Sequence, residues 1–339
     1  MAEITPTVKF DKPALPALWL DTSAVIKLTK IRKGESLQRI EIERGTRLRE
    51  LIVHLVRAGK LLCPESDQEE EYAAERLDDD VHRMFTELSL GISLRHRQGI
   101  LDEHIVKGME SYTKKSDTIH LPSSSYFHKD PVSELRERCE ERFIVTVGPL
   151  KSPEMLKRRA KAKAEISQKW EQLRQELVAK GQTYEKQLEL EMQGHWDALV
   201  ELVRRFEADM LSGKVDMWSF MGAQGPLLYR SVWTDLGGQP PGWKGLDGFF
   251  RSPYFTELPL PFIRCRLGAE LLTGNEPIQS GDSMDVELLS VALPVAHYVV
   301  TDRRMELRIK KLGLDTKCVV QVFSMATVDG LFGRLEKLK

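Results

Sequence analysis

Short apolar runs that end in an acidic residue recur along this chain and lie far apart in the sequence. Asp21 follows LWL, Asp302 follows YVVT, a run of three glutamates (69–71) comes soon after KLLCPES, and Asp285 lies in GDSMDVELLSVALP. Apolar runs of this length are typical of buried strands in an α/β sheet. The carboxyl ends of parallel strands meet at one edge of such a sheet, where ligands bind. The four acidic positions are therefore expected to converge on one crevice.

Carboxylates that converge in this way repel one another, and a hard divalent cation with oxygen ligands relieves the repulsion. A carboxylate-held Mg²⁺ or Mn²⁺ is a usual apparatus for phosphodiester hydrolysis. A structural role is the alternative for each acid. Asp21, Asp285 and Asp302 can each cap a helix, and the glutamates can form the solvated first turn of a helix, where the helix dipole favours them.

The two ends of the chain resemble the PIN-domain nuclease family. The opening strand ends in Asp21 and two hydroxyl residues, as in the first strand of that family. Near the other end, Asp285 opens an amphipathic helix that Pro294 ends, and a strand over 298–301 then runs into Asp302. The resemblance implies an α/β fold, a PIN-like parallel-sheet sandwich.

The resemblance also implies roles for particular side chains. Asp21, Asp285 and Asp302 would be catalytic residues that bind Mg²⁺ or Mn²⁺ or organise the metal-bound water. The second acid is expected on the helix after the second strand, where Glu70 fits best and its two glutamate neighbours are alternatives.

Two arginines directly follow the terminal acid, Arg303 and Arg304. In that place they can hold a phosphate of the substrate strand, because phosphate contacts of this kind position a nucleic acid. The alternative is an ordinary cationic start of a helix, which the helix dipole disfavours.

A long segment separates the second acid from the third, where the family usually has a few tens of residues. We expect a PIN-like domain in two parts, 14–75 and 259–339, interrupted by a helical insertion over 76–258. Within it, apolar residues spaced by three and four over about 152–211, with Gly181 between two arms, predict a projecting coiled-coil hairpin. Residues 111–131 are expected to form an exposed loop, and the aromatic tract 218–254 irregular structure.

Composition restricts the partners and the compartment. A formal net charge of −1 gives no global attraction to nucleic acid, so contacts with RNA must come from local basic patches. The four cysteines are scattered without a CxxC pair, which favours free thiols in a reducing compartment. No apolar run approaches a membrane span and the first residues do not read as a signal or transit peptide, so we expect no membrane partner and a cytoplasmic location.

The sequence thus predicts a metal-dependent endoribonuclease of PIN type with RNA as substrate. One alternative is a PIN-like scaffold with vestigial acids, whose helical insertion binds a protein partner. Another is a structure-specific DNA nuclease, which the same acids would serve. Oligomeric state and biological setting, whether toxin–antitoxin, defence or RNA processing, are left open.

Overall fold

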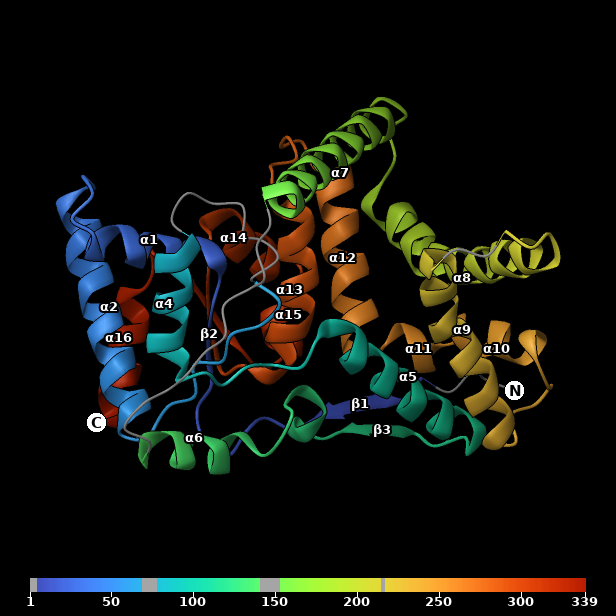
Figure 1. Cartoon of the computed structure of the whole chain (residues 1–339), viewed down its shortest axis with the longest axis horizontal. Helices are drawn as coiled ribbons and strands as arrows, with labels where there is room; N and C mark the ends of the chain where they lie inside the picture. The colour runs from blue at the N-terminus through green and yellow to red at the C-terminus, as the bar shows by residue number, and fades with distance from the viewer. Residues whose placement is uncertain (1–4, 69–77, 141–152, 215–216) are drawn as a thin grey trace.

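A computed structural model of the chain describes residues 5–68, 78–140, 153–214 and 217–339 (Figure 1). Glu70 and its two glutamate neighbours lie outside these residues. The fold is a mixed α/β fold with small parallel sheets, as expected from the sequence.

The main sheet contains three parallel strands in the order β2-β4-β5. Their bounds are β2 Leu18–Leu20, β4 Tyr298–Thr301 and β5 Gln321–Ser324. Two isolated parallel bridges, from Ala17 to Leu62 and from Glu65 to Ser93, continue the order beyond β2. The chain therefore builds the sheet outward on one side of β2 and returns to its other side with β4. The strand order reverses between β2 and β4, and that is the point where open parallel sheets form a ligand crevice.

Helices lie on either side of β2 in Figure 1. One group is α1 Thr22–Arg32, α2 Arg39–Arg57, α4 Asp78–Ser89 and α16 Asp329–Leu335. The other is α12 Pro259–Thr273 and α13 Asp282–Val295, while α14 Arg303–Lys311 and the short α15 Leu314–Lys317 join β4 to β5. The strands and helices of both groups share one buried apolar cluster, called here the first cluster.

A second buried cluster is rich in aromatic side chains. It fills the space between a two-stranded parallel sheet and several helices, and it includes Trp196 of α8 Tyr184–Leu211. The strands are β1 Thr7–Phe10 and β3 Thr118–Leu121, and the other helices are α5 Arg97–Thr113, α9 Met217–Asp235, α10 Trp243–Phe250 and α11 Pro253–Thr256. The prediction of an exposed loop over 111–131 is wrong. Ile119 and Leu121 are alternate residues of strand β3 whose side chains are buried in this cluster, and Tyr126 is also buried. The aromatic tract 218–254, expected to be irregular, is helical except for the connections between α9, α10 and α11, the longest of which is 236–242. The short η1 Ser123–Tyr126 and α6 Pro131–Glu140 follow β3.

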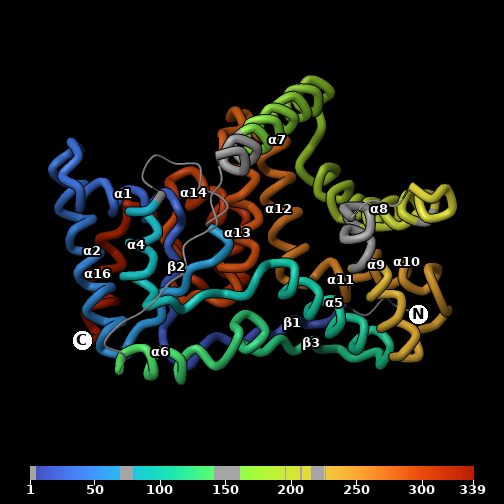
Figure 2. Tube along the Cα trace, viewed as in Figure 1, coloured from blue at the N-terminus to red at the C-terminus, as the bar shows by residue number. Residues whose placement is uncertain are grey.

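The region expected to form the hairpin contains two long helices, α7 Pro153–Ala179 and α8 Tyr184–Leu211. They separate at Gly181, whose φ of +66° ends α7 as predicted. The prediction of a projecting hairpin is wrong: α7 and α8 each pack against α12, and their described residues do not run along each other. Figure 2 shows α8 turning away from α7 after the connection. The reason is α12, which is apolar around most of its circumference and receives both helices.

The two clusters divide the chain differently from the three segments expected. Val81, Met84, Phe85 and Leu88 of α4 belong to the first cluster, together with strand residues from both ends of the chain. The first cluster therefore extends past residue 76. The division into two PIN-like parts and an insertion stays a prediction.

No helix in the described ranges has both the length and the apolar character needed to cross a membrane. Cys63, Cys265 and Cys318 are buried free thiols, as predicted, and Cys139 is exposed and free.

Candidate functional site

A groove of about 380 Å³ lies where β2, β4 and β5 reach their carboxyl ends. Its walls come from the first turns of α1, the start of α2, the beginning of α14 and the turn after β5. The lining residues are Ser23, Ala24, Lys27, Gln38, Ile40, Glu41, Arg44, Thr301, Asp302, Arg303, Ser324, Met325 and Ala326.

Asp21 is held immediately behind this groove. It directly follows β2, its side chain is buried, and its backbone N–H donates to the carbonyl of Val300 in β4 at 2.8 Å. Its Oδ2 accepts hydrogen bonds from Ser23 Oγ at 3.0 Å and from Thr301 Oγ1 at 3.1 Å. Because Ser23 and Thr301 both line the groove, the Asp21 carboxylate is held one hydrogen bond behind the groove wall.

Asp302 lies at the end of the neighbouring strand, β4, and lines the groove. It is the N-cap of α14: its Oδ1 accepts from the backbone N–H groups of Arg304 at 2.6 Å and Met305 at 3.1 Å. A cap of this kind stabilises a helix by about 1 kcal/mol. Asp302 therefore has the helix-capping role that the sequence offered as the alternative to metal binding. Both of these capping hydrogen bonds are accepted by Oδ1.

Asp285 is not part of the groove. The helix that it was expected to open, α13, begins one turn earlier at Asp282, and Asp285 is a half-buried residue of its first turn. Pro294 does not end this helix but lies in its last turn, where its missing N–H removes only one intrahelical hydrogen bond. Within the described residues, α13 contributes no residue to the groove wall.

The two arginines that follow Asp302 point to different places. Arg303 lines the groove, and its Nη1 donates to Glu306 at 2.8 Å. Arg304 turns away: its Nε donates to Glu276 at 3.0 Å and its Nη2 to the carbonyl of Pro277 at 2.9 Å. Only Arg303 is therefore placed to meet a ligand in the groove.

Glu306 is a residue of this site that sequence reasoning missed. Its side chain is fully buried and accepts hydrogen bonds from Arg303, from Lys310 at 2.7 Å and from Thr327 at 3.0 Å. Burial pushes its pKa upward, but the hydrogen bonds from Lys310, Ser324, Arg303 and Thr327 outweigh burial and hold the pKa below its usual value. The sequence did contain a signal for it: Glu306 lies three residues after Arg303 and four before Lys310, a spacing that favours ion pairs on one face of a helix. Glu306 thus fixes Arg303 from beneath.

The lowered pKa of Glu306 gives a pH-dependent stability. A carboxylate with a depressed folded-state pKa stabilises the fold above its unfolded-state pKa, and the stabilisation is lost as pH falls through the folded-state value. We expect Glu306→Gln to lower the free energy of unfolding at pH 7 by about 1.5–3 kcal/mol, the range for hydrogen bonds to a charged group. Below the usual glutamate pKa the difference between variant and wild type should shrink. Urea unfolding between pH 7 and pH 3 measures this, and a difference that is constant with pH would contradict it.

Gln68 is the last described residue before the three glutamates that were expected to supply the second acid. Its side chain is buried, and its Nε2 donates to the carbonyl of Leu20, the residue before Asp21, at 2.7 Å. Trp19 Nε1 also donates to Ser66 Oγ at 3.3 Å. The described chain that leads to residue 69 therefore runs against the carboxyl end of β2.

The oxygen atoms around the groove are of the type that a hard divalent cation prefers as ligands. They are the carboxylates of Asp21 and Asp302 and the hydroxyls of Ser23, Thr301 and Ser324. In the ranges that the structure describes, no group of three or more His, Cys, Asp or Glu side chains could hold a metal ion. The glutamates at 69–71 lie outside those ranges.

Comparisons with protein-family models, with curated proteins and with solved structures find no match to this chain.

Proposed function

We propose that this chain is a divalent-metal-dependent nuclease of PIN type that hydrolyses phosphodiester bonds in RNA. The observation that carries the proposal is the pair Asp21 and Asp302. These acids directly follow β2 and β4, two adjacent parallel strands, at the point where the strand order reverses and a groove opens. Acidic side chains at that position of a parallel sheet favour a ligand site over two independent helix starts.

Asp21, Asp302 and Glu70 would hold the metal ion. Glu70 lies outside the described residues, and it is included because Gln68, the last described residue before it in this segment, donates to the carbonyl of Leu20, which directly precedes Asp21. When bound, Mg²⁺ or Mn²⁺ supplies Lewis-acid stabilisation of a phosphoryl oxygen and lowers the pKa of a bound water. The proposal leaves out Asp285, because α13 takes no part in the groove wall.

Other groove residues would act on the nucleic acid. Arg303, fixed by Glu306, would contact a backbone phosphate. Lys27 and Arg44 add positive charge along the opposite wall, although each forms an ion pair, with Glu41 and Asp329 respectively. Phosphate groups of a bound RNA would compete with these carboxylates for the three cations.

The second candidate function is a PIN-like scaffold with vestigial acids. One observation favours it: the cap that Asp302 provides to α14 is a complete structural role without any metal. Partly exposed apolar side chains on α7 and α8, including Ile166, Leu173 and Leu190, would then belong to a protein-binding surface. The third candidate, a DNA nuclease, shares the groove and differs only in substrate.

Cleavage assays separate these functions. Wild-type protein is incubated with labelled single-stranded RNA or DNA, in Mg²⁺, Mn²⁺ or chelator. We expect metal-dependent cleavage of RNA, and a loss on the order of 100-fold or more in Asp21→Asn, the scale for removing one charge-stabilising group. The Asn side chain still offers an oxygen to Ser23 and Thr301, so the variant should keep its circular dichroism spectrum. Cleavage of DNA alone would favour the third candidate, and no cleavage of either substrate would favour the scaffold.

A further inference from the structure

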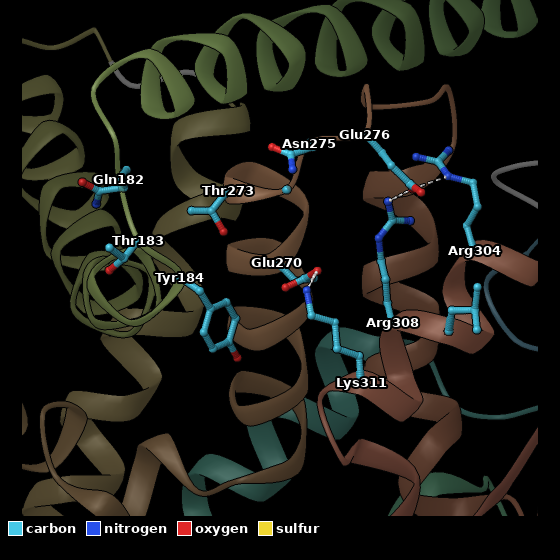
Figure 3. A pocket seen from close by; sticks show the side chains of 12 residues that line it. Gln182, Thr183, Tyr184, Glu270, Thr273, Asn275, Glu276, Arg304, Arg308 and Lys311 are labelled. Carbon is cyan, nitrogen blue, oxygen red and sulfur yellow. Dashed lines mark hydrogen bonds and ion pairs between the residues drawn. The ribbon is translucent and has the colours of Figure 1, made fainter.

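A second and larger pocket, of about 630 Å³, lies on the other side of α14 (Figure 3). It is bordered by the start of α8, the end of α12, the segment after α12 and one face of α14. The lining residues include Tyr184, Thr273, Asn275, Glu276, Arg304 and Arg308. No residue of this pocket lines the groove described above.

Two arginines with unused donors face this pocket. Arg308 is only 9% exposed, and its Nη2 donates to Glu276 at 2.8 Å. Arg304 donates to the same carboxylate through Nε at 3.0 Å. The Nη1 atoms of both arginines are buried and have no hydrogen-bond partner among the described residues. A buried donor without a partner is costly, so this pair of guanidinium groups is short of acceptor oxygens.

Glu276 is the anion that now joins the two arginines. In Figure 3 both guanidinium groups point toward its carboxylate, which accepts the two hydrogen bonds with the same oxygen, Oε2. The hydrogen bond from Arg304 and the charge of Arg308 lower its pKa. However, the Glu276 side chain is 63% exposed, and exposed ion pairs are worth little. A competing anion can therefore replace it at small cost.

The other charges of the region are already engaged. Lys311 donates to Glu270 at 2.7 Å. Asp282 lies 3.9 Å from Arg304 Nη2, and its Oδ2 accepts from the backbone N–H of Gln279 at 2.7 Å. Lys311, Glu270 and Asp282 therefore supply no acceptor to the two Nη1 atoms, and a ligand with several acceptor oxygens can do so.

We propose that this pocket binds the phosphate group of a phosphate monoester, which replaces the Glu276 carboxylate on Arg304 and Arg308. A phosphate monoester offers three acceptor oxygens and more than one negative charge, whereas a carboxylate offers two oxygens and one charge. Paired guanidinium groups suit such a group because they bind its oxygens in a bidentate manner. The volume is in the range of small-molecule sites, and Tyr184 and Asn275 supply a ring face and an amide for the rest of the ligand.

The phosphate monoester has two sources, a free phosphorylated small molecule or the phosphorylated end of a nucleic-acid strand. Isothermal titration of the full chain with inorganic phosphate, AMP and adenosine tests the chemistry. A short RNA with a 5′-phosphate or a 5′-hydroxyl then distinguishes the sources. We expect inorganic phosphate and AMP to bind and adenosine not to bind. Preference for AMP identifies the free molecule, and preference for the phosphorylated RNA identifies the strand end.

Substitutions of Arg308 and of Glu276 should change the affinity for AMP in opposite directions. Arg308→Gln should weaken binding of AMP about tenfold or more, the factor for losing one charged hydrogen bond. Arg308→Lys keeps the positive charge and should bind AMP more tightly than Arg308→Gln. Glu276→Gln should strengthen binding several-fold, because it removes the competing charge. The control is Arg264→Gln, which removes an arginine of α12 that pairs with Glu287 outside the pocket. Absence of phosphate binding in both wild type and Glu276→Gln would overturn the proposal, and so would binding that Arg308→Gln and Arg308→Lys leave unchanged.

Discussion

Asp302→Asn is expected to reduce metal-dependent cleavage of single-stranded RNA to background while leaving thermal stability in chelator unchanged or slightly higher. The asparagine keeps the volume and an oxygen for the N–H groups of Arg304 and Met305, and it caps a helix about as well as aspartate. It loses the negative charge that would offset a divalent ion. Without metal, removal of one carboxylate from a group of acids relieves repulsion. Cleavage and melting temperature should therefore respond in different directions.

The matched control is Asp130→Asn. Asp130 precedes α6, and its Oδ2 accepts from the backbone N–H of Ser133 at 2.8 Å, far from the groove in sequence and outside its wall. This variant changes the same chemical group in the same local role, so both cleavage and melting should match the wild type. A melting temperature that drops by many degrees in Asp302→Asn, with cleavage intact, would return Asp302 to a purely structural role.

Trp196→Ala is expected to destabilise the protein by about 3–5 kcal/mol, the usual cost of removing a buried aromatic side chain. The indole ring of Trp196 is 2% exposed and stacks on Phe250 with ring centres 4.3 Å apart. Its Nε1 donates to Asp247 Oδ1 at 2.7 Å. The alanine leaves a cavity in the second cluster and removes this hydrogen bond.

Urea unfolding of Trp196→Ala, with Leu190→Ala as control, measures this effect. Leu190 lies on the same helix and is 48% exposed, so its truncation should cost little. Equal, small effects of both variants would show that α8 does not hold the second cluster together. Replacing residues 152–211 by a Gly/Ser loop should expose both clusters, since Trp170 packs on the first and Trp196 belongs to the second.

The strands of the main sheet could be predicted because buried parallel strands are continuous apolar runs. The segments 18–20 and 298–301 are of this kind, and the aspartate that follows each of them marks where the strand stops. The placement of Asp21 and Asp302 at the same end of two adjacent strands follows from parallel pairing. By contrast, β3 lies among Ser, Lys and His residues, and its two buried residues are too few to make a strong pattern.

The packing of α7 and α8 could not be predicted from their apolar stripes. A stripe shows that one face of a helix is buried, but it does not show which element covers that face. The apolar stripes of two neighbouring helices suggested that the helices pack against each other. In the structure both pack against α12, which is buried on nearly all sides.

The directions in which side chains point at the candidate site could not be predicted from the sequence either. Consecutive residues on a helix point about 100° apart, so Arg303 and Arg304 had to face different surroundings. Only the packing of α14 decides that Arg303 faces the groove and Arg304 the second pocket. The burial of Glu306 depends in the same way on Thr327, a residue of the turn after β5.

The central claim, that Asp21 and Asp302 form a metal site, is tested most directly by titrating Mn²⁺ into wild-type protein and into the double variant Asp21→Asn/Asp302→Asn, with calorimetry as the readout. Both asparagines keep the hydrogen bonds that hold the local structure, so a loss of binding reports the lost carboxylate charge. We expect saturable Mn²⁺ binding in the wild type and none in the double variant. Equal binding in both proteins, or none in either, would contradict the claim.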